Sequence, residues 1–190
     1  MVSEMDMNDY KSAIKKLLNK SRYEHSINVS KAAEDIAKRY GISIKKARIA
    51  GLLHDITKNM TNKEQLEMIN KYNIEMSKLE LSMDKLWHAK TGAEYVKNEF
   101  AIDDEEIINA IRYHTTGKPN MSDIEKVIFV ADAIAEDRKF NGVDDIRKAI
   151  KKSLNEGVLA ALIASIDFLT IKKKPIHDDT FLAYNDILFD

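Results

Sequence analysis

The chain has 190 residues, with 30 Lys and Arg against 31 Asp and Glu, no cysteine, 6 Gly and 2 Pro. A net charge of −1 gives no basic surface of the kind that duplex nucleic acid requires in a partner. The absence of cysteine excludes disulfide scaffolds, thiolate zinc sites and cysteine nucleophiles. So few Gly and Pro residues disfavour a β-sandwich or barrel, which needs many tight turns, and indicate an all-α protein.

Hydrophobic residues recur at helical spacing along most of the chain, which predicts a compact bundle of eight or nine helices. Two of these helices begin with capping boxes, formed by Thr61 with Glu64 and by Ser122 with Glu125. The stretch 73–86 is the least regular, and 115–120 reads as a loop. The predicted helices cover approximately residues 10–18, 21–40, 43–55, 61–72, 88–100, 103–114, 122–134, 143–154 and 155–172.

The sequence contains no linker rich in Pro, Gly or Ser, so we expect residues 1–190 to form a single domain. Within it we expect a metal-binding core over about 21–140 and C-terminal helices and a tail over 143–190. The tail should pack through Phe181, Tyr184 and Leu188. No apolar run approaches the ~18 residues of a membrane span and the first residues are too acidic for a signal peptide. We therefore expect no membrane partner and a cytoplasmic location.

Carboxylates and imidazoles lie within otherwise apolar helical segments. His54 and Asp55 close the apolar helix predicted over 43–55, and Asp132 lies in the apolar helix predicted over 122–134. His25 lies on the preceding helix, over 21–40. An uncompensated charge in such surroundings costs several kcal/mol, and a shared cation would compensate both carboxylates. Nitrogen and oxygen ligands without sulfur suit iron, manganese, cobalt or zinc. The predicted metal ligands are His25, His54, Asp55 and Asp132, and open coordination positions would make the centre hydrolytic.

Further polar residues near this centre each have a functional and a plainer interpretation. His88 and His114 lie near helix ends and either bind a second metal ion or hold phosphate. Lys58 binds phosphate or caps its helix, and Arg138 binds phosphate or pairs with a surface acid. Asn28 lies one turn after His25 and lines the site or is solvated. The loop hydroxyls Thr115 and Thr116 contact substrate or solvent, whereas we expect core packing for Trp87 and solvated positions for His177 and for residues 172–174.

The order His25, His54-Asp55, Asp132 is similar to the H…HD…D pattern of the HD-domain metal-dependent phosphohydrolases, an all-helical superfamily. Further motifs resemble its YqeK-type branch and span nearly the whole chain. They are RYEHS (22–26), GLLHD (51–55), WHA (87–89), YHTTG (113–117), ADAI (131–134), Arg138 and AYN (183–185). The chain departs from that branch in the residues before Arg138 and at Asp178, where the branch often has proline.

The resemblance implies a symmetrical hydrolase that cleaves diadenosine tetraphosphate into two ADP with a metal-activated water. It implies iron, with His25, His54, Asp55 and Asp132 as ligands, although manganese, cobalt or nickel would also suit them. Catalytic roles would fall to Asp55, His88, His114 and Lys58. Substrate would contact His25, Asn28, His88, His114, Thr115, Thr116, Asp132 and Arg138.

Two other functions stay open at this point. One is another nucleotide phosphohydrolase on the same scaffold, such as a nucleotidase or a cyclic-dinucleotide phosphodiesterase. The other is a non-catalytic nucleotide-binding module, which the presence of all four metal ligands disfavours. The expected partner is a small-molecule dinucleoside polyphosphate or nucleotide, and a homodimer is one possible assembly.

Overall fold

The computed structural model describes residues 5–189, and every regular element in that range is helical. Within that range there are eleven α-helices and one short 3₁₀ helix. They are α1 (Met7–Leu17), α2 (Lys20–Tyr40), α3 (Ile44–Leu53), α4 (Asn62–Lys71), α5 (Lys78–Leu81), η1 (Asp84–Leu86), α6 (Trp87–Glu99), α7 (Glu105–Tyr113), α8 (Asp123–Ile134), α9 (Val143–Lys152), α10 (Leu154–Ile171) and α11 (Asp178–Phe189). The all-α prediction is confirmed.

The predicted helix count of eight or nine is too low, for two reasons. α5 is a single turn in the irregular stretch after α4, too short to show a hydrophobic period. α11 occupies the segment interpreted as a tail, and begins with Asp178 and Asp179, acidic residues suited to a helix N-terminus. The other predicted elements correspond to observed helices within a few residues at their ends.

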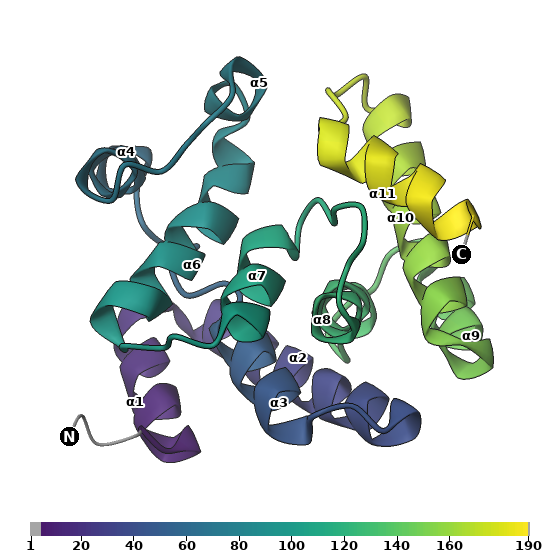
Figure 1. Ribbon diagram of the computed structural model, residues 1–190, viewed down its shortest axis with the longest axis horizontal. Coiled ribbons are helices and arrows are strands. Elements are labelled where there is room, and N and C mark those ends of the chain that lie inside the picture. Colours follow the sequence, from purple (N-terminus) through teal and green to yellow (C-terminus); the bar gives the residue numbers. More distant parts are fainter. Residues whose placement is uncertain (1–4, 190) are drawn as a thin grey trace.

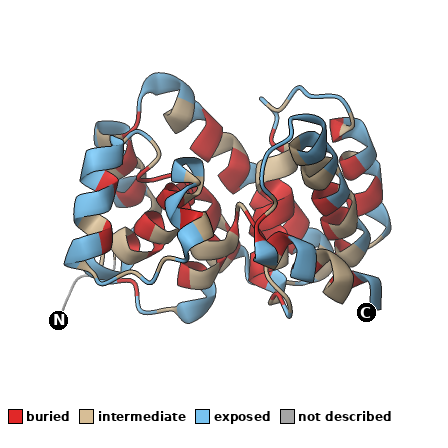
Figure 2. Cartoon of the chain, turned by 90° about the horizontal axis from the view of Figure 1, so that it is seen from above, coloured by how far each residue is buried: buried red, intermediate tan, exposed pale blue. Residues whose placement is uncertain are grey.

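The core is centred on α2, α3, α7 and α8, which lie side by side in the middle of the molecule (Figure 1). Their buried side chains are almost entirely aliphatic, and Figure 2 shows these buried residues concentrated on the inward faces of the helices. Leu52 and Leu53 on α3 and Ile128 and Val130 on α8 are fully buried. The polar residues of interest project from this rigid, water-excluding part of the fold.

Helices α2 and α3 pack closely against each other, and Gly51 allows this approach. A Cβ atom at Gly51 would lie 3.1 Å from the Ser30 Cα and 3.2 Å from the Val29 carbonyl oxygen. Both atoms belong to the backbone of α2 and cannot yield without moving the helix. A side chain here would push apart the two helices that carry His25 and His54, so the glycine fixes their separation.

The C-terminal helices α9, α10 and α11 form one side of the molecule, where α10 packs against α8, α9 and α11 (Figure 1). Among the described residues α10 is the one helix that is long and apolar enough to cross a membrane, by length and composition alone. The sequence argument missed it because Glu156 and Asp167 interrupt its apolar run. In the structure it lies against three other helices.

The packing predicted for the C-terminal segment is wrong in part. Phe181 and Leu188 are 57% and 51% exposed, whereas Tyr184 is partly buried against the core. Because the segment is a helix, its inward face repeats every three to four residues, and Thr180, Ala183 and Ile187 occupy that face.

Candidate metal centre

Six imidazole and carboxylate side chains from five segments meet in the middle of the fold. His25 comes from the first half of α2, and Asp132 from the last turn of α8. α3 ends at Leu53, and the tight turn that follows presents His54 and Asp55. His88 lies at the start of α6, and His114 directly follows α7. Helix ends therefore aim these side chains at one point from several directions.

The histidines offer their Nε2 atoms to the centre because other contacts use their Nδ1 atoms. His54 Nδ1 lies 2.8 Å from the Gly51 carbonyl oxygen, and His114 Nδ1 lies 2.7 Å from the Ile111 carbonyl oxygen. A carbonyl oxygen only accepts, so both Nδ1 atoms carry the proton and donate it. In the neutral ring each Nε2 then holds a lone pair.

His54 Nε2 is fully buried and has no hydrogen-bond partner among the described residues. Asp55 Oδ2 lies 3.7 Å from it and Asp132 Oδ1 lies 3.9 Å from it, and both oxygens are themselves electron-rich. An unpartnered buried nitrogen lone pair that faces two carboxylates is unfavourable unless a cation lies among them. This atom is the strongest structural sign of a metal site.

Three groups of ligand atoms in the centre are compact enough to hold an ion, each with its atoms within 4.8 Å of one another. One contains His25, His54 and Asp55, and a second contains His54, His114 and Asp132. The third contains Asp55, His88 and His114, with His88 Nε2 3.1 Å from Asp55 Oδ1 and 3.2 Å from His114 Nε2. Asp55 and the histidines thus form a continuous set of donors.

The pKa values of His54, His88, Asp55 and Asp132 match the protonation states that a metal requires, whereas burial acts to lower the pKa of His25 but Asp132 and Asp137 outweigh it and raise it. Burial lowers the pKa of His54 to about 4 and that of His88 to about 4, so both rings are neutral at pH 7. Burial acts to raise the pKa of Asp55 and Asp132, but the neighbouring histidines outweigh it and lower both. Neutral imidazoles and ionised carboxylates are the forms that bind metal ions.

His25 is oriented by a second carboxylate outside the cluster. Its Nδ1 donates to Asp137 Oδ2 at 2.8 Å, while its Nε2 lies 2.9 Å from Asp132 Oδ1. Asn28 donates in turn to Asp137 Oδ1 at 3.1 Å. A carboxylate that holds the outer nitrogen of a ligating histidine is a recurrent feature of metal sites. Asn28 thus reaches the centre through Asp137.

Three cationic side chains surround the carboxylates on the side open to solvent. Arg22 donates to Asp55 Oδ2 at 3.1 Å, and Lys58 Nζ lies 3.8 Å from Asp55 Oδ1 and 3.0 Å from His88 Nε2. Arg138 pairs with the Asp132 carboxylate and donates through Nε to the Asp132 carbonyl oxygen at 2.8 Å. Their partly exposed positions suit the binding of an anion.

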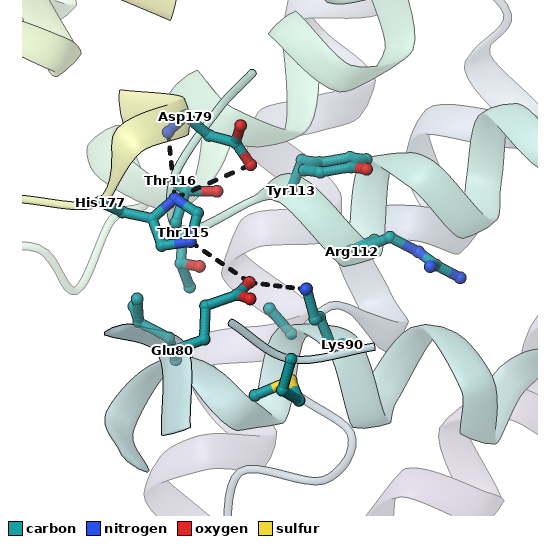
Figure 3. Close-up of a pocket in the computed structure, with 11 residues that line it drawn as sticks. Glu80, Lys90, Arg112, Tyr113, Thr115, Thr116, His177 and Asp179 are labelled. Carbon is teal, nitrogen blue, oxygen red and sulfur yellow. Dashed lines mark hydrogen bonds and ion pairs between the residues drawn. The ribbon is translucent and has the colours of Figure 1, made fainter. Parts of the chain in front are cut away.

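Thr115 and Thr116 lie elsewhere, on the wall of a small cavity of about 20 Å³ (Figure 3). The same wall holds His177, whose Nε2 is 3.2 Å from Glu80 Oε1, and Lys90, whose Nζ is 2.6 Å from that same oxygen. The predicted solvated position of His177 is wrong, because the turn into α11 places the ring, only 9% exposed, against α5 and α6. Trp87 is buried, as expected, and donates to the Glu80 carbonyl oxygen at 2.7 Å.

The structure thus brings together His25, His54, Asp55, Asp132, His88, His114, Lys58 and Arg138, with Asn28 one contact further out. Sequence reasoning missed Arg22 and Asp137 as site residues. Arg22 lies three residues before His25 on the same helix face, a spacing that could have revealed it. Asp137 follows the end of α8, and its sequence position alone gives no such signal.

The side chains present fit a divalent metal ion. Nitrogen and oxygen donors predominate, the donor atoms converge in a buried space, and the orphaned Nε2 of His54 requires an electropositive partner. This is the arrangement of a metal-dependent hydrolase built on an all-helical fold.

Comparison with known proteins places the chain in a family. The HD domain family matches residues 22–137, and the chain belongs to that family. Its relatives include the symmetrical bis(5′-nucleosyl)-tetraphosphatases of Halalkalibacterium halodurans and Bacillus subtilis. The first is 40% identical, over 93% of this chain and 94% of the relative, and the second is 38% identical, over 95% and 97%. The chain therefore belongs with these proteins, as its motifs indicated.

A solved structure agrees closely with the fold. It is a crystal structure from Clostridium acetobutylicum described as a predicted HD superfamily hydrolase involved in NAD metabolism. Its TM-score is 0.94 at 34% identity, and the match covers 98% of this chain and 99% of that one. The match therefore extends over the N-terminal helices, the metal centre and the C-terminal helices alike.

Proposed function

We propose that the protein hydrolyses diadenosine tetraphosphate symmetrically into two ADP molecules in the bacterial cytoplasm. The observation that carries the proposal is the cluster of histidines and ionised carboxylates around the orphaned His54 Nε2, in a chain whose relatives bear the name symmetrical bis(5′-nucleosyl)-tetraphosphatase. Symmetrical cleavage breaks the central anhydride bond: the oxygen of water joins one inner phosphorus and the bridging oxygen leaves with the other half.

The residues that would hold a divalent cation are His25, His54, Asp55 and Asp132, and we assign iron to them. Asp55, His88 and His114 form a group of their own and would hold a second ion that shares Asp55 with the first. A cation at such a site, when bound, makes water more acidic and neutralises charge on phosphate oxygens. Asp55 and Asp132 are ionised and His54 is neutral at pH 7, so these three ligands need lose no proton, whereas the raised pKa of His25 means that a cation competes with a proton for its Nε2.

The cationic side chains of the centre supply the other requirement of phosphoanhydride hydrolysis, which is compensation of negative charge. Arg22, Lys58 and Arg138 pair with the two carboxylates, and all three keep part of their surface exposed. We assign them to the tetraphosphate chain, where they would hold the phosphates in line and stabilise the charge that develops on the leaving diphosphate. The planar guanidinium groups of Arg22 and Arg138 suit two-point contacts with phosphate oxygens.

The test is a product analysis. Protein purified without oxygen would be supplied with Fe²⁺ or Mn²⁺ and incubated with diadenosine tetraphosphate, and the products separated by chromatography. The proposal predicts ADP as the sole nucleotide product. Equal amounts of ATP and AMP would contradict symmetrical cleavage, and no turnover with any divalent ion would contradict the hydrolase assignment.

The substrate alternatives on the same scaffold are tested in that assay. A nucleotidase would release inorganic phosphate from AMP or ADP, and a cyclic-dinucleotide phosphodiesterase would open a ring diester. Neither substrate carries the four consecutive phosphates that match three clustered cationic side chains.

A further inference from the structure

A groove of about 630 Å³ lies between α2, the end of α8 and α9, and one of its ends is linked to the metal centre by hydrogen bonds. Its near end is Asn28, which donates to Asp137, the carboxylate that accepts from His25 Nδ1. The groove therefore starts two hydrogen bonds from a proposed metal ligand. Ligand sites typically have volumes of ~300–1,000 Å³, so this groove is large enough for a nucleotide.

The groove is lined by one stripe of α2, by the end of α8 and by α9. On α2 the stripe continues from Asn28 through Lys31 and Asp35 to Arg39, at the spacing of a single helix face. Eleven residues of helix span about 16 Å, so the groove leads well away from the centre. It thus offers room beyond the metal ligands for one end of an elongated substrate.

The chemistry of the groove matches a nucleoside phosphate. Its floor is aliphatic, formed by Ile36, Ile134 and Ile150, of which the first and last are only 5% exposed. Four cationic side chains line it, against two acidic ones, Asp35 and Glu136. An apolar surface suits the face of a purine, cationic side chains suit phosphate, and an exposed carboxylate can accept from ribose hydroxyls.

One of the cations has a structural task. Arg147 Nη2 donates to the carbonyl oxygens of Ile134 and Ala135, each at 3.2 Å. These contacts fix the segment after α8. Lys31, Arg39 and Lys151 are exposed and remain for a ligand. The cavity in Figure 3 has only about 20 Å³, which holds roughly one water molecule. Of these two spaces, only the α2 groove is large enough for a nucleoside.

We propose that this groove binds the nucleoside and outer phosphate of one half of a dinucleoside tetraphosphate, with the inner phosphates at the metal centre. The inference rests on the proposed function for the identity of the whole substrate. It identifies Arg39 and Lys151, on opposite elements of the groove, as residues that select a substrate with a nucleoside at each end.

The test uses the full-length charge-reversal variant Arg39→Glu/Lys151→Glu. Both residues are exposed, on α2 and α9, so the fold should persist. Lys16→Glu, an exposed lysine of α1, is the matched control. Calorimetry would measure the affinity of metal-free protein for ADP, and steady-state kinetics would measure KM and kcat for diadenosine tetraphosphate with metal-loaded protein.

We expect the variant to bind ADP at least tenfold more weakly, and to raise KM at least tenfold with kcat within twofold, while the control matches wild type. A variant that binds ADP as tightly as wild type overturns the groove proposal, whatever its kinetics. If wild type fails to hydrolyse the dinucleotide but the variant still loses ADP affinity, the groove is a nucleotide site and the proposed function is wrong. The two failures are therefore distinguishable.

Discussion

Within residues 5–189 two clusters are built from histidine and carboxylate side chains, and they differ in how their charges are balanced. In the cluster of Figure 3, Glu80 lies 2.6 Å from the Lys90 ammonium and 3.2 Å from His177, and the amide of Asp179 donates to His177 Nδ1. In the metal centre, His54 Nε2 has no partner among the described residues and faces two carboxylates.

Residue type alone therefore does not mark a functional site. The His177 cluster is complete within the chain, since each of its charged groups has an opposite charge or a donor, and it joins α11 to α5 and α6. The metal centre is incomplete, because the lone pair of His54 Nε2 faces carboxylate oxygens and no hydrogen-bond donor among the described residues reaches it. Incompleteness of this kind is what an added cation would satisfy, and four predictions probe it.

The largest effect is expected for Asp132→Asn, which preserves volume but removes the negative charge. Rates of diadenosine tetraphosphate hydrolysis should fall by about a thousandfold or more, since a metal supplies several kcal/mol of charge stabilisation. Steady-state assays with excess Mn²⁺ would measure this, with circular dichroism to verify folding. Activity within tenfold of wild type would place the reaction elsewhere.

The free energy of unfolding of the metal-free protein should depend on pH through His54 in the metal centre. The pKa of His54 is about 4 in the fold against 6.5 for an ordinary histidine. Between pH 6.5 and about 4, this histidine is therefore protonated in the unfolded chain but neutral in the folded protein. Stability that is present above pH 6.5 is therefore lost as pH falls toward 4, by about 3 kcal/mol for this residue. Urea unfolding would give the free energy of unfolding of metal-free wild type and of His54→Gln at each pH. The contribution of His54 is the change with pH in the difference between these two free energies. A constant difference would contradict the neutral buried ring.

His177→Ala should destabilise the fold without affecting the metal centre. Loss of the ring removes a partner from Glu80, but Lys90 still compensates that carboxylate. We expect the free energy of unfolding to fall by about 1–3 kcal/mol, with metal content per folded chain unchanged. Denaturant titration and metal analysis of the same sample would show this. Loss of bound metal in His177→Ala would mean that the two clusters are coupled.

The smallest effect is expected for Asp137→Asn, which weakens the contact to His25 Nδ1. The asparagine oxygen can still accept, so the ring should stay in place with less polarisation. Metal affinity should decline by about tenfold, which is the lower end of the range of losses found when a residue that orients a metal ligand is replaced. A competition titration with a chelator would measure it, and Asp35→Asn, on the exposed face of α2, is the matched control.

Much of the fold was predictable from the sequence because helical periodicity and capping residues are local. The capping boxes at Thr61 and Ser122 are both present. α5 and α11 were not predicted, since a single turn has no period and an amphipathic C-terminal segment resembles a tail. The close approach of Gly51 to the backbone of α2 depends on the packing of two helices and could not be predicted from local sequence.

The metal ligands were predictable because a carboxylate in an apolar helix is costly and so conspicuous, as Asp55 and Asp132 are. His177 was misplaced for the converse reason: its compensation comes from Glu80, about a hundred residues earlier, which no local pattern reveals. Arg22 and Asp137 were missed because charged residues near helix ends are common. Their roles depend on long-range contacts with Asp55 and His25.

We expect the orphaned His54 Nε2 and its neighbours to bind a metal ion, and we expect the His177 cluster to bind none. The most direct measurement is the metal content of wild type, His54→Gln and His177→Gln after dialysis against Mn²⁺ and removal of free ion. The account predicts at least one ion per chain in wild type and His177→Gln, and a clear loss in His54→Gln. Equal metal content in all three proteins, or none in wild type, would contradict it.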